Sequence, residues 1–303
     1  MTVLVTGGAG LVGMAVRRTL ARHGRDVVAV DRTDFGRGDP GLHIAALDDI
    51  DGLRTLASAR PIDAIVHCGA ISGPMMAKGD PRAIVETNIV GTATMLDLAR
   101  DIVRDRGGCR YVFCSSISVY GSVGGAVITE DTPLHPSSVY GASKVAGEQL
   151  VEGYAAEYGV SGVSLRISRV YGPHRRGDCL IRKMVEEADA AREAVIPCED
   201  GFLYHYIHVD DVASAILSAL VADRIGHHVY NVASNIPATM GEVVAAAQAV
   251  LPGLRVRLVP GRDDVPDIQA GFDTMRIAAD LGWQARLDLE RGIAAYAAAL
   301  HAA

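Results

Sequence analysis

The stretch TVLVTGGAGLVG, residues 2–13, joins a short apolar run to a glycine-rich turn that includes the triplet Gly7, Gly10 and Gly13. The apolar run predicts a buried strand, and the stretch LVGMAVRRTLARHG, residues 11–24, has apolar residues three or four positions apart, as in a helix. Glycines at such a junction permit a tight turn and let the backbone approach a pyrophosphate, whose negative charge then faces the helix N-terminus. Because turns are rich in glycine anyway, the residues around the triplet decide its meaning.

The second apolar run, DVVAVD at residues 26–31, supplies that context because it ends in Asp31. An acid about 20 residues after the glycines of a strand–helix–strand unit can accept hydrogen bonds from both ribose hydroxyls of an adenosine. Its carboxylate would repel a 2′-phosphate, so the sequence favours NAD over NADP. Arg32, the next residue, would attract that phosphate instead. The alternative is a simple turn followed by a surface acid.

Apolar strands alternate with amphipathic helical patterns up to about residue 170. This alternation predicts an α/β fold, a doubly wound parallel Rossmann sheet. Past that point the rhythm loosens, which predicts a smaller C-terminal substrate lobe at the carboxyl edge of the sheet. We expect residues 1–168 to form the NAD-binding domain, completed by about residues 207–234, and residues 169–206 and 235–303 to form the lobe. The predicted core strands are TVLVTG, DVVAVD, DAIVHCGA, RYVFCSS, GVSLRIS and HVYNVAS.

The composition excludes several classes of protein. Of the 303 residues, 49% are hydrophobic and 21% charged, and the formal net charge is −7, so neither nucleic acid nor an anionic membrane is an expected partner. The five cysteines form no CxxC pair, which is typical of a reducing compartment. No apolar run approaches the roughly 20 residues of a membrane span. A strand that begins at Thr2 leaves no room for a signal peptide, so we expect a cytoplasmic protein.

A second cluster of reactive side chains lies in SSVYGASKVAGE, residues 137–148. Tyr140 and Lys144 are four residues apart, so they share one face of a helix. An ammonium group close to a phenol favours the phenolate, which allows tyrosine to act as an acid or a base. The preceding predicted strand ends in Ser115 and Ser116, whose hydroxyls can polarise a substrate oxygen. In isolation such a tyrosine–lysine pair is usually solvated, and its combination with the glycine loop points to catalysis.

These residues resemble the extended short-chain dehydrogenase/reductase family, of the NAD-dependent epimerase/dehydratase type. The resemblance runs through nearly the whole chain and rests on several motifs in the same order. The motifs are TGGAGLVG, VVAVDR, ALDDIDGL, HCGA, ETNIVGT, SSISVYG, YGASK, RVYGPH, YIHVDDVA, YNVAS and LGW. The resemblance implies an oxidoreductase that uses NAD on a sugar-like small molecule. It also implies a homodimer, paired through the helix that carries Tyr140 and the long helix before it, residues 91–103.

The resemblance assigns roles to individual residues. Tyr140 is the expected catalytic acid and base, Lys144 holds the nicotinamide ribose and assists the tyrosine, and Ser116 orients the substrate oxygen. Asn88 is expected to support the central helix, and either Asp48 or Asp49 to contact the adenine. The expected NAD contacts are Gly7, Gly10, Leu11, Val12, Gly13, Asp31, Arg32, Asp48, Asp49, Cys68, Gly69, Ala70, Asn88, Tyr140 and Lys144.

The segment EDGFLYHYIHVDD, residues 199–211, is rich in histidine, aromatic and acidic residues, so a metal site is one interpretation. A metal needs ligands that converge on one point, whereas alternate residues of an extended chain face opposite ways. His205 and His208 therefore diverge, and we expect no metal. By the resemblance, the segment re-enters the main domain, His208 is structural, and Asp210 and Asp211 cap the following helix.

Substrate recognition is where the sequence departs from the family. Nucleotide-sugar members carry a diphosphate-clamping arginine at the position of Tyr204, and a second arginine before Gly-Asp, with which Arg262 is out of register. Arg169 stands where asparagine is usual, and Ser72 follows the cofactor loop as a similar serine does in uronate dehydrogenases. The expected substrate contacts are Ser72, Ser116, Arg169 and Tyr204.

Plainer interpretations of two of these residues stay open. Ser72 is then an ordinary loop serine. Arg169 then forms a structural ion pair with an acid such as Glu130 or Asp131.

Several functions compete for an NAD-dependent site of this kind. The favoured one is a dehydrogenase acting on a secondary hydroxyl or carbonyl of a small non-nucleotide sugar or sugar acid, because such a substrate needs no diphosphate clamp. The alternative is a nucleotide-sugar 4-epimerase of the UDP-hexose type, and an epimerase of a free or otherwise modified sugar also fits. Dehydration is disfavoured because Ser116, Ile117 and Ser118 stand where dehydratases carry Thr-Asp-Glu. A non-catalytic NAD sensor would not need serine, tyrosine and lysine together.

Overall fold

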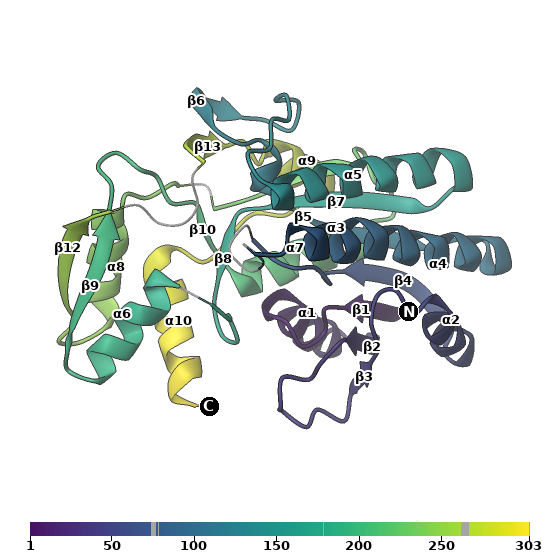
Figure 1. Ribbon diagram of the computed structural model, residues 1–303, viewed down its shortest axis with the longest axis horizontal. Coiled ribbons are helices and arrows are strands. Elements are labelled where there is room, and N and C mark those ends of the chain that lie inside the picture. The colour runs from purple at the N-terminus through teal and green to yellow at the C-terminus, as the bar shows by residue number, and fades with distance from the viewer. Residues whose placement is uncertain (74–76, 78, 178, 235, 262–266, 303) are drawn as a thin grey trace.

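A seven-stranded parallel sheet forms the centre of the molecule (Figure 1). The computed structural model describes residues 1–73, 77, 79–177, 179–234, 236–261 and 267–302. The strand order is β11-β7-β5-β4-β1-β2-β3, and the chain winds outward in both directions from β1 and β4, which confirms the predicted doubly wound Rossmann sheet. The strands are β1 (Thr2–Thr6), β2 (Asp26–Asp31), β3 (Leu42–Ile44), β4 (Ile62–His67), β5 (Arg110–Ser116), β7 (Ser161–Ile167) and β11 (Val229–Val232).

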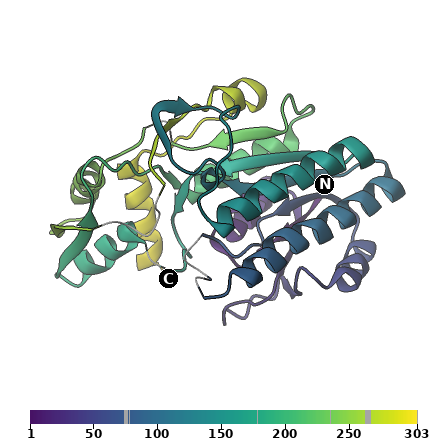
Figure 2. The same cartoon turned by 45° about the horizontal axis from the view of Figure 1, so that its top comes forward.

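Helices cover both faces of the sheet because its strands are apolar on both sides. Val3 and Val5 pack with one set of helices, whereas Leu4 between them packs with the other, as the alternation of side chains along a strand requires. Figure 2 shows two long helices of the second set, α4 and α5, side by side. The first set is α1 (Leu11–Arg22) and α7 (Val209–Val221), and the second is α2 (Ile50–Ala59), α4 (Gly91–Arg106) and α5 (Val139–Tyr158), with α3 (Pro81–Val85) and the π-helical turn η1 (Glu86–Val90) leading into α4.

The apolar face of α4 belongs to this core. Met95, Leu96 and Ala99 are fully buried and Ile102 is 6% exposed, all packed in one cluster with strand residues. The apolar residues that the sequence suggests for a dimer interface are therefore already buried in the core of this chain. The homodimer itself stays a prediction.

A smaller lobe follows the carboxyl ends of β7 and β11 and lies on that side of the sheet (Figure 1). Its own core includes Ile181, Met184, Val243 and Ile293, which are fully buried. Its elements are α6 (Leu180–Asp189), β9 (Glu193–Cys198), α8 (Met240–Val250), β12 (Arg255–Pro260) and α10 (Leu289–His301). Two parallel strand pairs connect lobe and sheet, namely β8 (Arg169–Tyr171) with β10 (Tyr206–His208), and β6 (Val123–Ile128) with β13 (Gln269–Phe272).

One C-terminal segment departs from the expected division of the chain. Helix α9 (Met275–Leu281) contacts β11, and Ile277 and Trp283 are buried in the core of the sheet rather than in that of the lobe. The Trp283 indole donates to Ser214 Oγ at 2.8 Å. Residues 275–283 therefore belong with the sheet, although the sequence placed them in the lobe.

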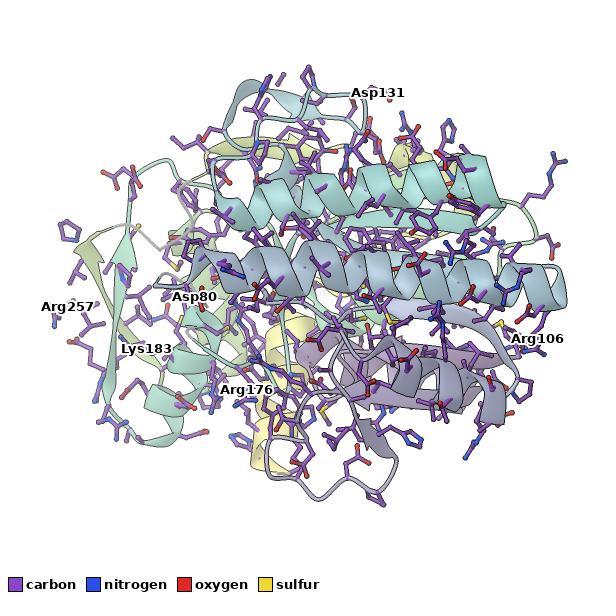
Figure 3. All side chains as sticks on the ribbon, turned by 45° about the vertical axis from the view of Figure 1, so that its right-hand side comes forward. Asp80, Arg106, Asp131, Arg176, Lys183 and Arg257 are labelled. Atoms are coloured by element: carbon purple, nitrogen blue, oxygen red, sulfur yellow. The ribbon has the colours of Figure 1, made fainter. Side chains whose placement is uncertain are left out.

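Basic side chains lie on more than one side of the molecule. Figure 3 places Arg106, at the end of α4, and Arg257, on β12, at opposite sides of the molecule. Within the described ranges, no helix has the length and apolar character needed to cross a membrane.

Candidate active site

The glycine loop between β1 and α1 is shaped for close approach of a ligand. Gly7 has φ +64°, in the left-handed region that favours glycine, and a Cβ there would lie 2.8 Å from the carbonyl carbon of Cys68. Gly13 packs so closely on the Gly7 carbonyl that a side chain would clash with it. The N-cap of α1 is Gly10, so it offers no side chain to the first-turn N–H groups, which include those of Leu11 and Val12. These donors suit a dinucleotide pyrophosphate.

Asp31 is held in place at the carboxyl end of β2. Its carboxylate accepts the backbone N–H of Ala9 at 3.1 Å and that of Arg32 at 2.8 Å. The Asp31 side chain therefore lies beside the glycine loop. The Arg32 side chain is exposed.

The two candidates for the adenine differ in their surroundings. Asp49 is the N-cap of α2, and its carboxylate accepts the N–H of Gly52 at 3.0 Å. Asp48 is exposed on the same loop. Asp49, which is also exposed, is thus engaged in the helix cap, and a contact of either acid with adenine stays a prediction.

The loop after β4 is fixed from both sides. The Gly69 N–H donates to Thr6 Oγ1 at 3.0 Å, and Thr6 Oγ1 also lies 2.7 Å from Nδ1 of the buried His67. The loop residues Cys68 and Gly69 therefore sit against the end of β1 and beside Gly7. A role for His67 was not predictable from the sequence, because a histidine inside an apolar run has no visible partner.

Asn88 connects this loop to the catalytic helix. It lies in the π-helical turn η1 and is 2% exposed. Its amide oxygen accepts from Ile71 N at 2.8 Å, while its amide nitrogen donates to Ile71 O at 3.1 Å and to Ser143 Oγ at 3.0 Å. Ser143 lies on α5 between Tyr140 and Lys144, so Asn88 ties the loop to α5.

Ser116, Tyr140 and Lys144 gather at the carboxyl end of β5. The Lys144 Nζ donates to the carbonyl oxygen of Cys114 at 2.8 Å and lies 5.8 Å from the ring centroid of Tyr140. Ser116 is the last residue of β5, and its Oγ lies 3.2 Å from Ser118 Oγ and accepts the Ser118 N–H. The 3-10 helix η2 (Ile117–Val119) that begins there packs on α5. The arrangement therefore presents hydroxyls and an ammonium group at one edge.

A buried ion pair that the sequence analysis overlooked supports this edge. Glu148 accepts from Ser115 Oγ at 2.5 Å and from Arg166 Nη2 at 2.7 Å. Both charged side chains are at most 5% exposed. The spacing of Lys144 and Glu148, four residues apart on α5, was a usable signal, but the partner on β7 was not visible in the sequence.

Arg169 lies on two aromatic rings at the base of the lobe. Its guanidinium carbon is 5.5 Å from the ring centroids of both Tyr204 and Tyr206, a distance suited to cation–π attraction. Tyr204 is only 2% exposed. This differs from the expected direct contact between Tyr204 and a substrate, because the ring supports Arg169 from within the core.

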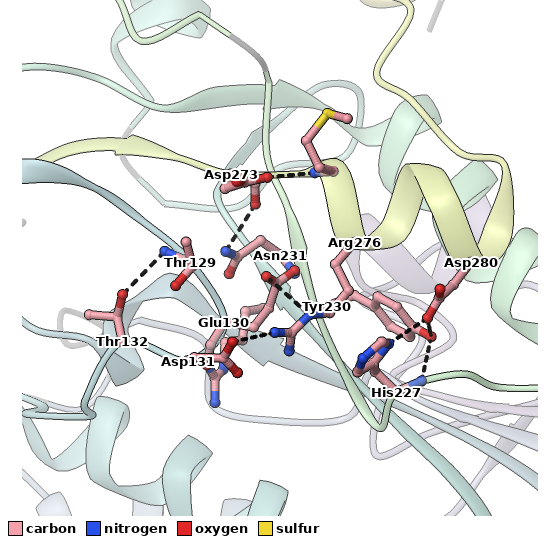
Figure 4. A network of polar contacts seen from close by, with 12 residues as sticks. Thr129, Glu130, Asp131, Thr132, His227, Tyr230, Asn231, Asp273, Arg276 and Asp280 are labelled. Carbon is pink, nitrogen blue, oxygen red and sulfur yellow. Dashed lines mark hydrogen bonds and ion pairs between the residues drawn. The ribbon is translucent and has the colours of Figure 1, made fainter.

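The two acids considered as examples of ion-pair partners for Arg169 both lie within ion-pair distance of another arginine. Arg276 lies 2.7 Å from Asp131 and 3.6 Å from Glu130 (Figure 4). Ser72 is exposed, next to the loop held by Asn88. Arg262 lies outside the described residues.

The two histidines of residues 199–211 separate as expected. His205 Nε2 lies 3.0 Å from the carbonyl oxygen of Gln269, and His208 packs against Tyr171. Among the residues that the structure describes, no group of three potential metal ligands occurs. The predicted helix cap was wrong, because His208 caps α7 by accepting from the N–H of Asp210.

The acids expected to form that cap have other partners. Asp210 pairs with Arg18 of α1. Asp211 accepts the backbone N–H groups of Arg286 and Leu287 at 3.1 and 2.9 Å, so it fixes the C-terminal segment to α7.

Comparisons with known proteins agree with this geometry. A dTDP-glucose 4,6-dehydratase of Haemophilus influenzae is 27% identical over 97% of this chain and 96% of that protein. A UDP-glucose 4-epimerase of Corynebacterium glutamicum is 31% identical over 82% of this chain and 80% of that protein. The solved structure of MoeE5 in complex with UDP-glucuronic acid and NAD is 28% identical, with a TM-score of 0.85, and covers 100% of this chain and 99% of that one.

The sequence model of the NAD dependent epimerase/dehydratase family matches residues 3–233. The match includes the glycine loop, Asp31 and the edge with Ser116, Tyr140 and Lys144. The chain therefore belongs to the NAD-dependent epimerase/dehydratase family of extended short-chain dehydrogenases/reductases, and it is an enzyme whose cofactor is NAD.

Proposed function

We propose that the enzyme is a nucleotide-sugar 4-epimerase, which oxidises one sugar hydroxyl to a ketone and reduces the ketone from the opposite face. The observation that carries this proposal is the loop after β5, which offers Ser116 and Ser118 hydroxyls to a sugar oxygen but has Ile117 between them. An elimination of water would require an acid and a base beside the sugar, and residues 116–118 contain no carboxylate. This favours epimerisation over the dehydration named for several relatives.

The names of the relatives also bear on the substrate. The dehydratase and the epimerase act on dTDP-glucose and UDP-glucose by name, and MoeE5 was solved with UDP-glucuronic acid. A nucleotide sugar is therefore better supported than the small non-nucleotide substrate that the sequence favoured.

In this mechanism Tyr140 moves the proton of the sugar hydroxyl. Its phenolate oxygen takes that proton, Lys144 stabilises the phenolate, and Ser116 orients the sugar oxygen by hydrogen bonding. Bound NAD would supply the hydride acceptor for the carbon that carries this hydroxyl and the hydride donor for reduction of the ketone. Rotation of the ketone between the two hydride transfers inverts the carbon, and Tyr140 then gives the proton back.

Arg169 places a cation at the start of β8, two residues after the end of β7. We propose that it binds an anionic group of the substrate, with Ser72 assisting. Two anionic groups are candidates. One is the diphosphate, for which this chain has a tyrosine instead of an arginine at position 204. The other is a carboxylate on the sugar. A guanidinium can hold either by two parallel hydrogen bonds.

Product analysis tests the proposed function. Purified enzyme with NAD is incubated separately with UDP-glucose, UDP-glucuronic acid and dTDP-glucose, and the products are identified by NMR and mass spectrometry. A 4-epimer of unchanged mass without accumulation of NADH is expected. NADH formed in an amount equal to the product would instead indicate a dehydrogenase. A product lighter by one water molecule would indicate a dehydratase.

The division into an NAD-binding domain and a substrate lobe, a cytoplasmic location and a homodimer complete the proposal. Light scattering at micromolar concentration tests the last of these. A monomer would contradict it.

A further inference from the structure

A short piece of the C-terminal segment contacts both catalytic segments. The amide nitrogen of Gln269 donates to the carbonyl oxygens of Ile117 at 3.1 Å and Gly121 at 2.8 Å. Two residues earlier, Asp267 Oδ1 accepts from Ser137 Oγ at 2.6 Å. Gln269 is 6% exposed and Asp267 is 7% exposed, so both side chains are buried, whereas their partner Ser137 lies at the surface.

The contacted residues lie next to the proposed catalytic groups. Ile117 directly follows Ser116, and Gly121 ends the loop that begins there. Ser137 precedes Ser138, the N-cap of α5, and stands three residues before Tyr140. Residues 267–269 thus reach the flanks of both the serine and the tyrosine.

The chemistry of Gln269 fits its place. A primary amide nitrogen carries two N–H donors, and two carbonyl oxygens from opposite ends of the loop receive them. No other residue type of this length offers two donors without a charge. Replacement by an apolar residue would leave two carbonyls without these bonds in a buried place, which permits the loop to shift.

Gln269 is also connected to the strand that carries the aromatic rings under Arg169. His205 Nε2 donates to the Gln269 carbonyl oxygen at 3.0 Å, and burial lowers the pKa of His205, which keeps its ring neutral. The His205 carbonyl oxygen in turn accepts the backbone N–H of Arg169 at 2.9 Å. One chain of hydrogen bonds therefore joins β8 to the serine loop.

We propose that Gln269, assisted by Asp267, is a positioning residue that fixes the serine loop and the start of α5 relative to the substrate lobe. This inference rests on the proposed roles of Ser116 and Tyr140. Gln269 does not take part in proton transfer and acts only through the groups whose backbone it holds.

The first test separates turnover from binding. Gln269→Met should lower kcat by about 10- to 100-fold, while the KM for the nucleotide sugar and the Kd for NAD stay within about threefold, because the amide is proposed to orient Ser116 rather than to contact either ligand. The matched control is Gln248→Met, whose amide also donates to a backbone carbonyl, that of Leu254, but inside the lobe. A loss of turnover equal to that of the control would overturn the proposal.

A double-mutant cycle identifies the group through which Gln269 acts. In the Ser116→Ala background, Gln269→Met should reduce kcat by less than about threefold further, because the positioned hydroxyl is already gone. If the kcat of the double variant instead falls by the product of the two single-variant factors, the glutamine does not act through Ser116.

Hydrogen exchange supplies a readout that needs no substrate. In the full-length enzyme with NAD, Gln269→Met should speed exchange of the amides of residues 116–122, and Ser137→Ala should do so for residues 137–141. Unchanged exchange in these peptides would refute the positioning role. If wild-type enzyme epimerises no sugar, the proposed function fails, but this measurement still decides the positioning claim.

Discussion

The ammonium group of Lys144 donates a hydrogen bond to the Cys114 carbonyl oxygen at 2.8 Å and thereby fixes helix α5 to strand β5. The same ammonium lies 4.9 Å from the ring centroid of Phe113 and 5.8 Å from that of Tyr140. With 4% of its surface exposed, Lys144 has little freedom to move. The position of its charge beside Tyr140 is thus set by the scaffold, which makes the roles of these residues testable by substitution.

Replacing Tyr140 by phenylalanine should lower turnover by at least about two orders of magnitude, because it removes the proposed acid and base but keeps the ring. The Kd for NAD should change little. The control is Tyr158→Phe, at the exposed end of the same helix. Near-wild-type turnover in the Tyr140 variant would rule out its catalytic role.

Asp31 should make the enzyme prefer NAD to NADP, because a 2′-phosphate would meet a carboxylate that Ala9 and Arg32 hold in place. Asp31→Asn should narrow the ratio of the two kcat/KM values, whereas Asp26→Asn, at the exposed start of β2, should not. A wild-type preference for NADP would show that Arg32 dominates the choice.

Arg169→Ala should lower kcat/KM by about one to two orders of magnitude for the substrate whose anion it binds. If that anion is a sugar carboxylate, kcat/KM should fall for UDP-glucuronic acid and hardly change for UDP-glucose. If it is the diphosphate, kcat/KM should fall equally for both substrates. The control is Arg257→Ala, an exposed lobe arginine paired with Glu193 (Figure 3). Unaltered kinetics with both sugars would refute anion binding by Arg169.

His67 should make the protein less stable in acid. Burial, with a smaller contribution from the charge of Lys144, lowers the pKa of His67 from 6.5 to about 3. The unfolded chain therefore takes up a proton near pH 6.5 that the folded chain refuses until about pH 3. Above pH 6.5 this residue does not make the free energy of unfolding depend on pH. Between about pH 6.5 and 3 it lowers the free energy of unfolding by up to about 1.4 kcal/mol for each pH unit of acidification.

Urea unfolding at several pH values measures this effect. His67→Gln should reduce the slope of stability against pH between about pH 6 and 4, where only the unfolded wild-type chain gains the proton. His43→Gln, an exposed histidine on β3, should leave the slope as it is. Equal slopes in all three proteins would contradict the buried neutral state of His67.

The central strands were predictable because a strand buried on both faces is apolar over its whole length. Strand β3 (Leu42–Ile44) was not, since it has three residues at the edge of the sheet and two of them are exposed. The reactive edge was predictable for a similar reason: Tyr140 and Lys144 follow the period of one helix.

Partners from distant parts of the chain account for what the sequence could not provide. Asp211 has the right place for a helix cap, but it binds backbone groups 75 residues away. Gln269 looks like any polar residue until β13 brings it under the serine loop, 148 residues from Gly121. Local patterns contain no information on such pairs.

The burial of Trp283 in the core of the sheet has a practical consequence. It is the only tryptophan of the chain, is 4% exposed, and donates from its indole nitrogen to Ser214 on α7. Its fluorescence therefore reports whether the C-terminal segment is docked on α7, since the emission of an indole shifts to longer wavelength in water. Circular dichroism follows the helices as a whole. A red shift that precedes the loss of helix during denaturation would thus reveal a form in which the segment has detached while the sheet persists.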